Sequence, residues 1–138
     1  MSKHAELLIV DGYNILNAWE MTDSNINLEA ARQDLVEILA DFGGYRGIDI
    51  MVVYDAHQSE TSGTENEIGS LTEVYTKKHE TADSRIERMM KQKVKRHPKV
   101  TVATADYALQ LFVLGAGGLR MTPHELRLMV EEARGSKL

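Results

Sequence analysis

Short apolar runs recur along the chain and predict the strands of a sheet. They are shorter than a typical helix and rich in β-branched side chains, as buried strands are. The predicted strands are Leu7–Val10, Ile48–Tyr54, Glu73–Thr76, Val100–Ala103 and Leu119–Met121. Glu73–Thr76 is expected nearer an edge of the sheet. The polar stretch His57–Ser70 is predicted to be a mobile loop.

Between these runs, apolar residues recur at helical spacing. Asn27 and Thr81 each precede such a segment and are predicted N-caps. The expected helices run from Leu28 to Gly43-Gly44, from Thr81 to about Arg96, through Leu109 to Gly115, and onward from Thr122-Pro123. Strands that alternate with helices predict an α/β fold, a three-layer sandwich with a mainly parallel sheet and right-handed crossovers.

Composition limits the class of protein. The chain has 138 residues, 43% of them hydrophobic and 27% charged, which predicts one globular domain over residues 1–138. Because cysteine is absent, disulfide partners and thiolate zinc sites are excluded. No apolar run has the length of a signal peptide or a membrane span, so we expect a cytoplasmic protein without a membrane partner.

An aspartate follows three of the predicted strands: Asp11 in VDGYN, Asp55 in VYDAH and Asp106 in TADYA. Ligands of open α/β sheets bind outside the carboxyl ends of the strands. A fourth acid, Asp83, lies in the first turn of a predicted helix, on its apolar, sheet-facing side. Each aspartate alone is equally well explained as a cap for backbone N–H groups. Four carboxylates at one sheet edge would repel one another, however, and the usual remedy is a cation.

The available ligand types indicate which cation this would be. Carboxylate oxygens, without cysteine or paired histidines, predict Mg²⁺ or Mn²⁺. Magnesium held by carboxylates typically serves phosphoryl chemistry. Asn14 either hydrogen-bonds a phosphate, a water or a neighbouring aspartate, or stabilises the turn after the strand. The histidines lack ligand spacing and are expected at surface or loop positions: His4, His57, His79, His97 and His124.

Several segments together carry a family resemblance. In chain order they are IVDGYNIL, VVYDA, YTKKHETADSRIERM, VATADYALQ and GGLRMTPHEL. They resemble the YacP-like NYN family, whose domains are similar to PIN-domain nucleases. The resemblance implies a PIN-like fold and a metal-dependent endoribonuclease. Its best-understood relatives associate with the ribosome and cut mRNA in the A site during translation.

The resemblance also implies a set of site residues. Asp11, Asp83 and Asp106 would hold the metal, and Asp55 would act directly or through water. Asn14 completes the expected catalytic set. His79 stands where the family pattern leads us to expect glycine, and the chain ends sooner after its last helix than relatives do.

Basic residues gather between positions 77 and 99, although the net charge of the chain is -5. Taken alone, they are either a solvated helix face or a stripe that contacts phosphates. The resemblance suggests that those flanking Asp83 hold an RNA backbone: Lys77, Lys78, Arg85 and Arg88. The later segment Lys91–Lys99 could contact ribosomal RNA instead.

Aromatic and glycine residues near the predicted site have plainer explanations. Tyr13 and Tyr107, close to site aspartates, could stack on a base, but we expect them to pack. Trp19 is likewise expected in the core or as loop cover. The glycine-rich stretches Gly43–Gly47 and Gly115–Gly118 fall where helices should end, and neither matches a phosphate-binding loop.

Two other functions are compatible with parts of this pattern. A module that binds RNA or the ribosome without cleaving would keep the fold but would not need four crowded acids. A signalling receiver domain would use Asp55 as its phosphate acceptor. A receiver also needs an acidic pair near Asp11 and a lysine at the end of a late strand. Here Gly12 follows Asp11, and the late strand leads to Asp106.

Overall fold

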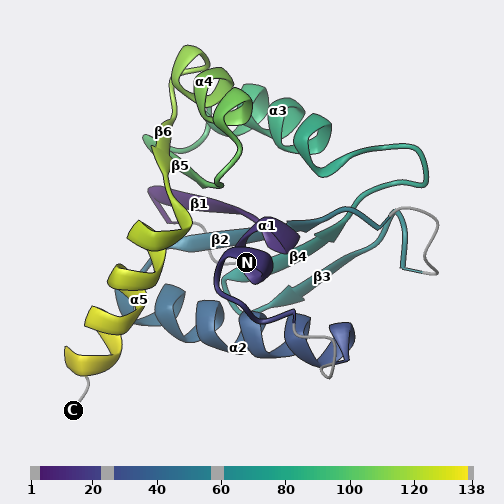
Figure 1. Cartoon of the computed structure of the whole chain (residues 1–138). Coiled ribbons are helices and arrows are strands. Elements are labelled where there is room, and N and C mark those ends of the chain that lie inside the picture. Colours follow the sequence, from purple (N-terminus) through teal and green to yellow (C-terminus); the bar gives the residue numbers. More distant parts are fainter. Residues whose placement is uncertain (1–3, 23–26, 57–60, 137–138) are drawn as a thin grey trace.

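A six-stranded sheet lies between two layers of helices in the computed structural model, which describes residues 4–22, 27–56 and 61–136 (Figure 1). Helices α1, α2 and α5 cover one face of the sheet, and α3 and α4 cover the other. The strands are β1 Glu6–Asp11, β2 Asp49–Tyr54, β3 Glu65–Ile68, β4 Leu71–Tyr75, β5 Lys99–Ala103 and β6 Leu119–Met121. The helices are α1 Gly12–Ala18, α2 Leu28–Arg46, α3 Ala82–Lys93, α4 Tyr107–Gly115 and α5 Pro123–Ser136.

The strand order is β3-β4-β2-β1-β5-β6. All neighbouring strands are parallel except β3 and β4, which form an antiparallel hairpin. The predicted α/β sandwich with a mainly parallel sheet is therefore confirmed. Because β2, β1 and β5 are adjacent and parallel, their carboxyl ends meet at one edge of the sheet.

Strand alternation divides the core in two. Leu8 and Val10 of β1 pack under α1, α2 and α5, whereas Leu7 and Ile9 pack under α3 and α4. Asp11 continues the second series, so its side chain is directed toward the layer of α3 and α4. The same alternation applies to β2. Val53 packs in the layer of α3 and α4, and Asp55, two residues later, is on the same side.

Two predicted boundaries were wrong. Helix α2 continues through Gly43 and Gly44 to Arg46 and ends at Gly47, whose φ of 68° suits glycine. Gly43 instead allows close packing, because a Cβ there would lie 2.9 Å from Ile50 Cδ1. Helix α3 ends at Lys93 rather than near Arg96.

The predicted loop His57–Ser70 contains an unexpected strand, β3. All four of its side chains are exposed at the sheet edge, so the sequence carries no apolar signal for it. Consequently β4, predicted near an edge, lies inside the sheet between β3 and β2. Residues 57–60 lie outside the described part of the chain.

Helix α1 was missed because it is short and begins directly after β1. Trp19, just after it, is buried as expected, and its indole N–H donates to the Pro123 carbonyl at 2.9 Å. Along the described residues, no helix is both long and apolar enough to cross a membrane.

Candidate functional site

Four aspartates from four different elements converge at the carboxyl edge of the sheet. Asp11 ends β1, Asp55 follows β2, Asp106 precedes α4, and Asp83 lies in the first turn of α3. They lie close enough to interact: the negative charges of Asp83, Asp106 and Asp55 all raise the pKa of Asp11. The structure thus brings together the acids that the sequence singled out.

Asp11 is the most buried of the four. Its pKa is raised from 3.8 to about 6, by burial more than any other cause and also by the three neighbouring carboxylates. One hydrogen bond opposes these effects: the Thr104 hydroxyl donates to Asp11 Oδ2 at 2.9 Å. A single neutral donor leaves most of the cost of burying this charge uncompensated.

Asp83 and Asp106 interact directly. Burial is the largest cause that raises the pKa of Asp83, followed by the charge of Asp106 and a hydrogen bond between the two side chains. Asp106 also caps α4, because its Oδ1 accepts from Leu109 N–H at 3.0 Å. The capping role considered for this aspartate is therefore real, and it fixes the carboxylate at the site.

Asp55 contributes a buried oxygen that is unpaired. Its Oδ1 has no hydrogen-bond partner within the described residues, although buried carboxylate oxygens normally have one. Its charge raises the pKa of both Asp11 and Asp83. An acceptor of this kind is suited to a ligand that the protein chain itself does not supply.

The loop between β5 and α4 is held by three side chains. The Thr104 hydroxyl donates to Asp11 and accepts from Asp106 N–H at 3.1 Å, so it joins two of the acids. Asn14 Oδ1 accepts from Ala105 N–H at 2.8 Å, and Gln110 Nε2 donates to the Thr104 carbonyl at 2.7 Å. Asn14 thus braces the loop that carries Asp106. Thr104 was missed, although its place two residues before a site aspartate was a usable signal.

The DGYN segment also depends on Gly12. A Cβ at this position would lie 2.4 Å from the ring of Tyr54, so only glycine fits without movement. Tyr13 packs on the same ring at a centroid distance of 5.0 Å, and its hydroxyl accepts from Arg32 at 3.0 Å. The expectation that Tyr13 packs is confirmed.

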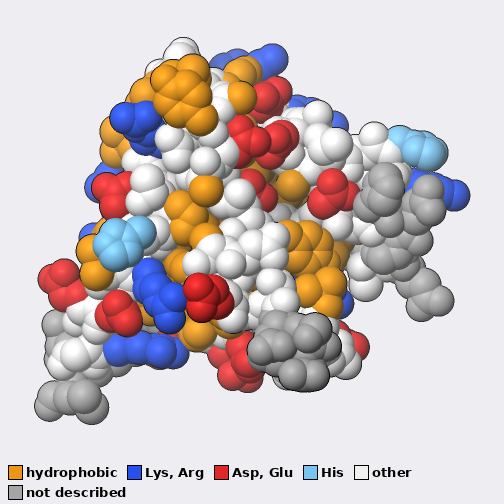
Figure 2. Space-filling model, in the orientation of Figure 1, with side chains coloured by type: hydrophobic (Ala, Val, Ile, Leu, Met, Phe, Trp, Pro, Cys, Tyr) orange, Lys and Arg blue, Asp and Glu red, His pale blue; other side chains and the backbone are white. Residues whose placement is uncertain are grey.

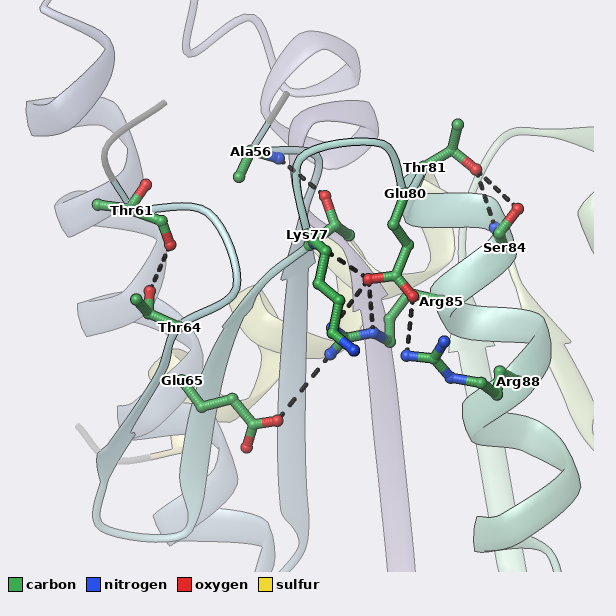
Figure 3. Close-up of polar contacts among 11 residues, drawn as sticks. Ala56, Thr61, Thr64, Glu65, Lys77, Glu80, Thr81, Ser84, Arg85 and Arg88 are labelled. Atoms are coloured by element: carbon green, nitrogen blue, oxygen red, sulfur yellow. Dashed lines mark hydrogen bonds and ion pairs between the residues drawn. The ribbon is translucent and has the colours of Figure 1, made fainter. Parts of the chain in front are cut away.

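Glu80 anchors the loop that leads into α3 (Figure 3). Its Oε1 accepts from Lys77 N–H at 3.1 Å and from Arg85 Nε at 3.0 Å, and its Oε2 lies 2.7 Å from Arg88 Nη2. Burial alone would raise the pKa of Glu80, but these donors outweigh it and lower the pKa. Thr81 Oγ1 then caps the helix by accepting from Ser84 N–H at 3.1 Å. The sequence did not identify Glu80, because its contacts with Lys77, Arg85 and Arg88 depend on the folded conformation of this loop.

Arg85 occupies a different place from the one predicted. Its guanidinium is buried, with Nη2 at 2.8 Å from Glu80 and Nη1 at 3.9 Å from Glu65 of β3 (Figure 3). It therefore ties the β3 hairpin to α3 and is not presented to an RNA backbone. Arg88 remains about half exposed while it pairs with Glu80.

An open groove beside the site is lined by the remaining basic residues. Lys77, Lys78 and His79 are exposed there, together with Arg88. His79 replaces the glycine expected from the family pattern without strain, because the only non-glycine residue with positive φ in the described part of the chain is Glu20.

One expectation about a single residue was wrong: Tyr107, expected to pack, is 66% exposed. His97, expected at the surface or in a loop, lies in the loop between α3 and β5, where it is buried near Asp49 at the other end of the sheet. Of the other histidines, His79 and His124 are exposed, His4 is half-buried, and His57 lies outside the described residues.

The donor set fits a hard divalent cation, since every candidate ligand is a carboxylate oxygen and Asp55 Oδ1 is buried without a partner. As they stand, no three His, Cys, Asp or Glu side chains in the described ranges are arranged to hold a metal ion. Neighbouring carboxylates raise the pKa of Asp11 and of Asp83, but the present geometry of the acids is not a finished coordination sphere.

Comparison with known proteins identifies the family. The model of the YacP-like NYN domain matches residues 8–137. The uncharacterized protein YacP of Bacillus subtilis (strain 168) is 35% identical over 128 residues, which cover 91% of this chain and 75% of that protein. Crystal structures of Rae1 (YacP) from Bacillus subtilis and of a mutant of it are similar, with TM-scores of 0.80 and 0.79 at 34% identity. These matches cover 94% of this chain and 76% and 77% of the two solved chains.

The comparisons confirm the family resemblance and the fold, and they remove the receiver-domain alternative. They also support a nuclease-like function related to RNA. The chain belongs to the YacP-like NYN domain family.

Proposed function

We propose that this chain is a metal-dependent endoribonuclease that hydrolyses RNA phosphodiester bonds. The observation that supports the proposal is the convergence of four aspartates, whose neighbouring charges help to raise the pKa of Asp83 and, with burial, bring that of Asp11 to about 6. Within the described residues, no lysine or arginine forms an ion pair with any of the four. A divalent cation would relieve this repulsion, whereas a module that only binds RNA would gain nothing from it.

Asp11, Asp83 and Asp106 are the residues that would hold Mg²⁺ or Mn²⁺, with Asp55 as a direct or water-linked fourth. Once bound, the ion would supply activation of water and stabilisation of charge on the phosphate. The chain contributes the positions of the ligands: Thr104 orients Asp11, the α4 cap holds Asp106, and Glu80 fixes the start of the helix that carries Asp83.

RNA binding falls to a small number of exposed cations. Lys77, Lys78 and Arg88 line the groove beside the site, and Arg85 is excluded by its pairing with Glu80. Phosphate contacts supply much of the affinity for nucleic acids, and the chain as a whole has a net charge of -5. We therefore propose that the ribosome presents mRNA to this site, which would place the protein in the cytoplasm.

The test is cleavage of an end-labelled mRNA in three mixtures: with the protein alone, with translating ribosomes alone, and with both. We expect Mg²⁺- or Mn²⁺-dependent products with 5′-phosphate and 3′-hydroxyl ends when protein and ribosomes are combined, and no such products in EDTA. Of the three mixtures, we expect the highest cleavage activity from the one that contains both the protein and translating ribosomes. Cleavage that persists in EDTA would overturn the metal-dependent mechanism, and full activity on free RNA would overturn the role of the ribosome.

A further inference from the structure

Helix α4 has an unusual distribution of polarity. Its sequence, YALQLFVLG, contains a single side chain with an amide or charge, Gln110. That side chain is buried, where it donates to the Thr104 carbonyl. The rest of the helix is apolar on the side facing the core and also on the side facing solvent. A helix that is hydrophobic all round is normally buried on all sides. The composition of α4 therefore indicates that another molecule packs on its outer, solvent-exposed face.

The outer face presents three large side chains at helical spacing. Tyr107, Leu111 and Leu114 are 66%, 50% and 45% exposed. They are three of the eight large hydrophobic side chains that are exposed in the described residues. Figure 2 shows hydrophobic side chains gathered over α4, at the top of the view. We call Tyr107, Leu111 and Leu114 the α4 face; an exposed apolar stripe of this kind marks interaction sites.

Positive charge borders this face on one side. An open groove between α3 and α4 is lined by Phe112, Gly115 and Ala116 of the α4 region and by Lys91 and Lys95 of the α3 region. No acidic residue lines the groove. Within the described residues, neither lysine forms an ion pair. The groove adjoins the α4 face, because Leu111 and Leu114 are next to Phe112 and Gly115 in the helix.

We propose that the α4 face and this groove dock an amphipathic helix of a protein partner, with acidic residues beside its apolar anchors. Anchors at i, i+3 or i+4 and i+7 would match the spacing of Tyr107, Leu111 and Leu114. Lys91 and Lys95 would pair with the partner's carboxylates at the end of the face that is distant in sequence from Asp106. A protein fits better than RNA, because two of the three exposed side chains are leucines, which offer bases no stacking surface.

This docking site does not depend on the proposed nuclease activity, and its test uses binding alone. Two designed peptides of about 15 residues would share leucine anchors at the stated spacing and carry either glutamate or lysine beside them. The intact chain is titrated into each fluorescently labelled peptide, and binding is read from fluorescence anisotropy. We expect saturable binding of the glutamate peptide, and binding of the lysine peptide weaker by about tenfold or more.

Two variants and a matched control locate the binding. Leu111→Ser should weaken binding of the glutamate peptide by about tenfold or more. Leu128→Ser on α5, where the leucine is 52% exposed, should leave it unchanged. Lys91→Glu combined with Lys95→Glu leaves the apolar packing intact and should reverse the preference toward the lysine peptide. Circular dichroism verifies that each variant is folded.

Several results would overturn the proposal. These are no binding of the glutamate peptide, equal binding of both peptides, or equal losses with Leu111→Ser and Leu128→Ser. A single-stranded DNA oligonucleotide that binds this chain and loses binding with Leu111→Ser would identify nucleic acid as the occupant. Self-association in sedimentation that Leu111→Ser abolishes would identify a second copy of the chain instead.

Discussion

Asp11 ends β1 and Asp49 begins the neighbouring parallel strand β2, so these two aspartates lie at opposite ends of one strand pair. Both are removed from much of the solvent, and both lose hydration as a result. Their surroundings differ in one respect, which is the supply of hydrogen-bond donors. This difference separates a structural acid from an acid that is suited to bind a cation.

Asp49 has its donors from His4, and His97 lies nearby. The His4 backbone N–H donates to Oδ2 at 2.9 Å, the His4 ring Nδ1 lies 2.7 Å from Oδ1, and His97 Nε2 lies 3.5 Å from Oδ2. Because His97 Nε2 forms no hydrogen bond within the described residues, the His4 contacts are the firmer ones. Burial alone would raise the pKa of Asp49, but these contacts outweigh it and lower the pKa.

Asp11 has one hydroxyl donor and three acidic neighbours, and its pKa rises to about 6. A fold that keeps such an arrangement loses stability unless another group compensates the charge. The comparison teaches that the position of an aspartate at a strand end does not by itself indicate function. The informative feature is a buried carboxylate whose neighbours fail to compensate it.

The largest effect should separate these two acids in an RNA cleavage assay. Asp11→Asn or Asp83→Asn should lower cleavage by about a thousandfold or more, because each removes a charged ligand of the proposed cation. Asp49→Asn should leave cleavage within about twofold of the parent protein, since its partners lie at the far end of the sheet. Comparable losses in all three variants would show that the assay reports folding and would break the comparison.

The next effect concerns stability and has opposite signs for the two acids. Since the pKa of Asp11 rises from 3.8 to about 6 on folding, the folded chain binds more protons than the unfolded chain between these values. Its stability therefore falls as the pH rises through this window, by about 3 kcal/mol in total. In EDTA at about pH 7, Asp11→Asn should raise the free energy of unfolding by about that amount, and the gain should vanish below about pH 4. Urea unfolding at several pH values measures this directly.

Asp49→Asn provides the matched control with the reverse sign. The pKa of Asp49 is lowered on folding, so its contribution is present above its unfolded pKa and is lost as the pH falls through its folded pKa. Its replacement should reduce the free energy of unfolding by about 1 to 3 kcal/mol at neutral pH.

Mg²⁺ should stabilise the parent protein and have little effect on Asp11→Asn. Destabilisation by Asp11→Asn in EDTA would contradict the view that Asp11 is uncompensated.

A smaller effect is expected from Glu80, which acts on the site through its neighbours. Glu80→Gln should lower cleavage by about 10- to 100-fold, as is typical when a group that orients a metal ligand is changed. The apparent Mg²⁺ affinity should weaken with it, because the start of α3 would hold Asp83 less firmly. Arg88→Gln is the control for Mg²⁺ affinity and stability, and not for cleavage, because Arg88 lines the proposed RNA groove. It removes a partly exposed ion pair, should leave the Mg²⁺ affinity unchanged, and should change stability by less than about 1 kcal/mol. An unchanged Mg²⁺ affinity in Glu80→Gln would contradict the positioning role.

Much of the fold could be predicted from the sequence because burial leaves a periodic pattern. The strands β1, β2, β5 and β6 were each indicated by a short apolar run. Strand β3 could not be predicted, since it is held to β4 by backbone hydrogen bonds and one bond between the Asn66 and Glu73 side chains, while its own side chains stay exposed. Gly43 was ambiguous because glycine both ends helices and permits close packing, and only the nearby Ile50 side chain distinguishes the two.

The acids of the site could be predicted, but their partners could not. The four aspartates follow strand ends or start a helix, which topology alone brings to one edge. Arg85 and Arg88 are equivalent in a charge pattern, yet Arg85 is buried against Glu80 and Glu65 while Arg88 remains about half exposed. The choice between them depends on the hairpin that carries Glu65 and on the loop that carries Glu80. The hairpin contact is long-range, and the Glu80 contacts depend on how the loop before α3 folds.

The most direct test of the central claim is anomalous diffraction from crystals soaked in Mn²⁺. The account predicts an anomalous peak between Asp11, Asp83 and Asp106, with carboxylate oxygens at about 2 Å from the ion. It predicts no peak at Asp49, whose charge the histidines already compensate. A site without a peak, or an Asp83 side chain turned to solvent in the soaked crystal, would contradict it.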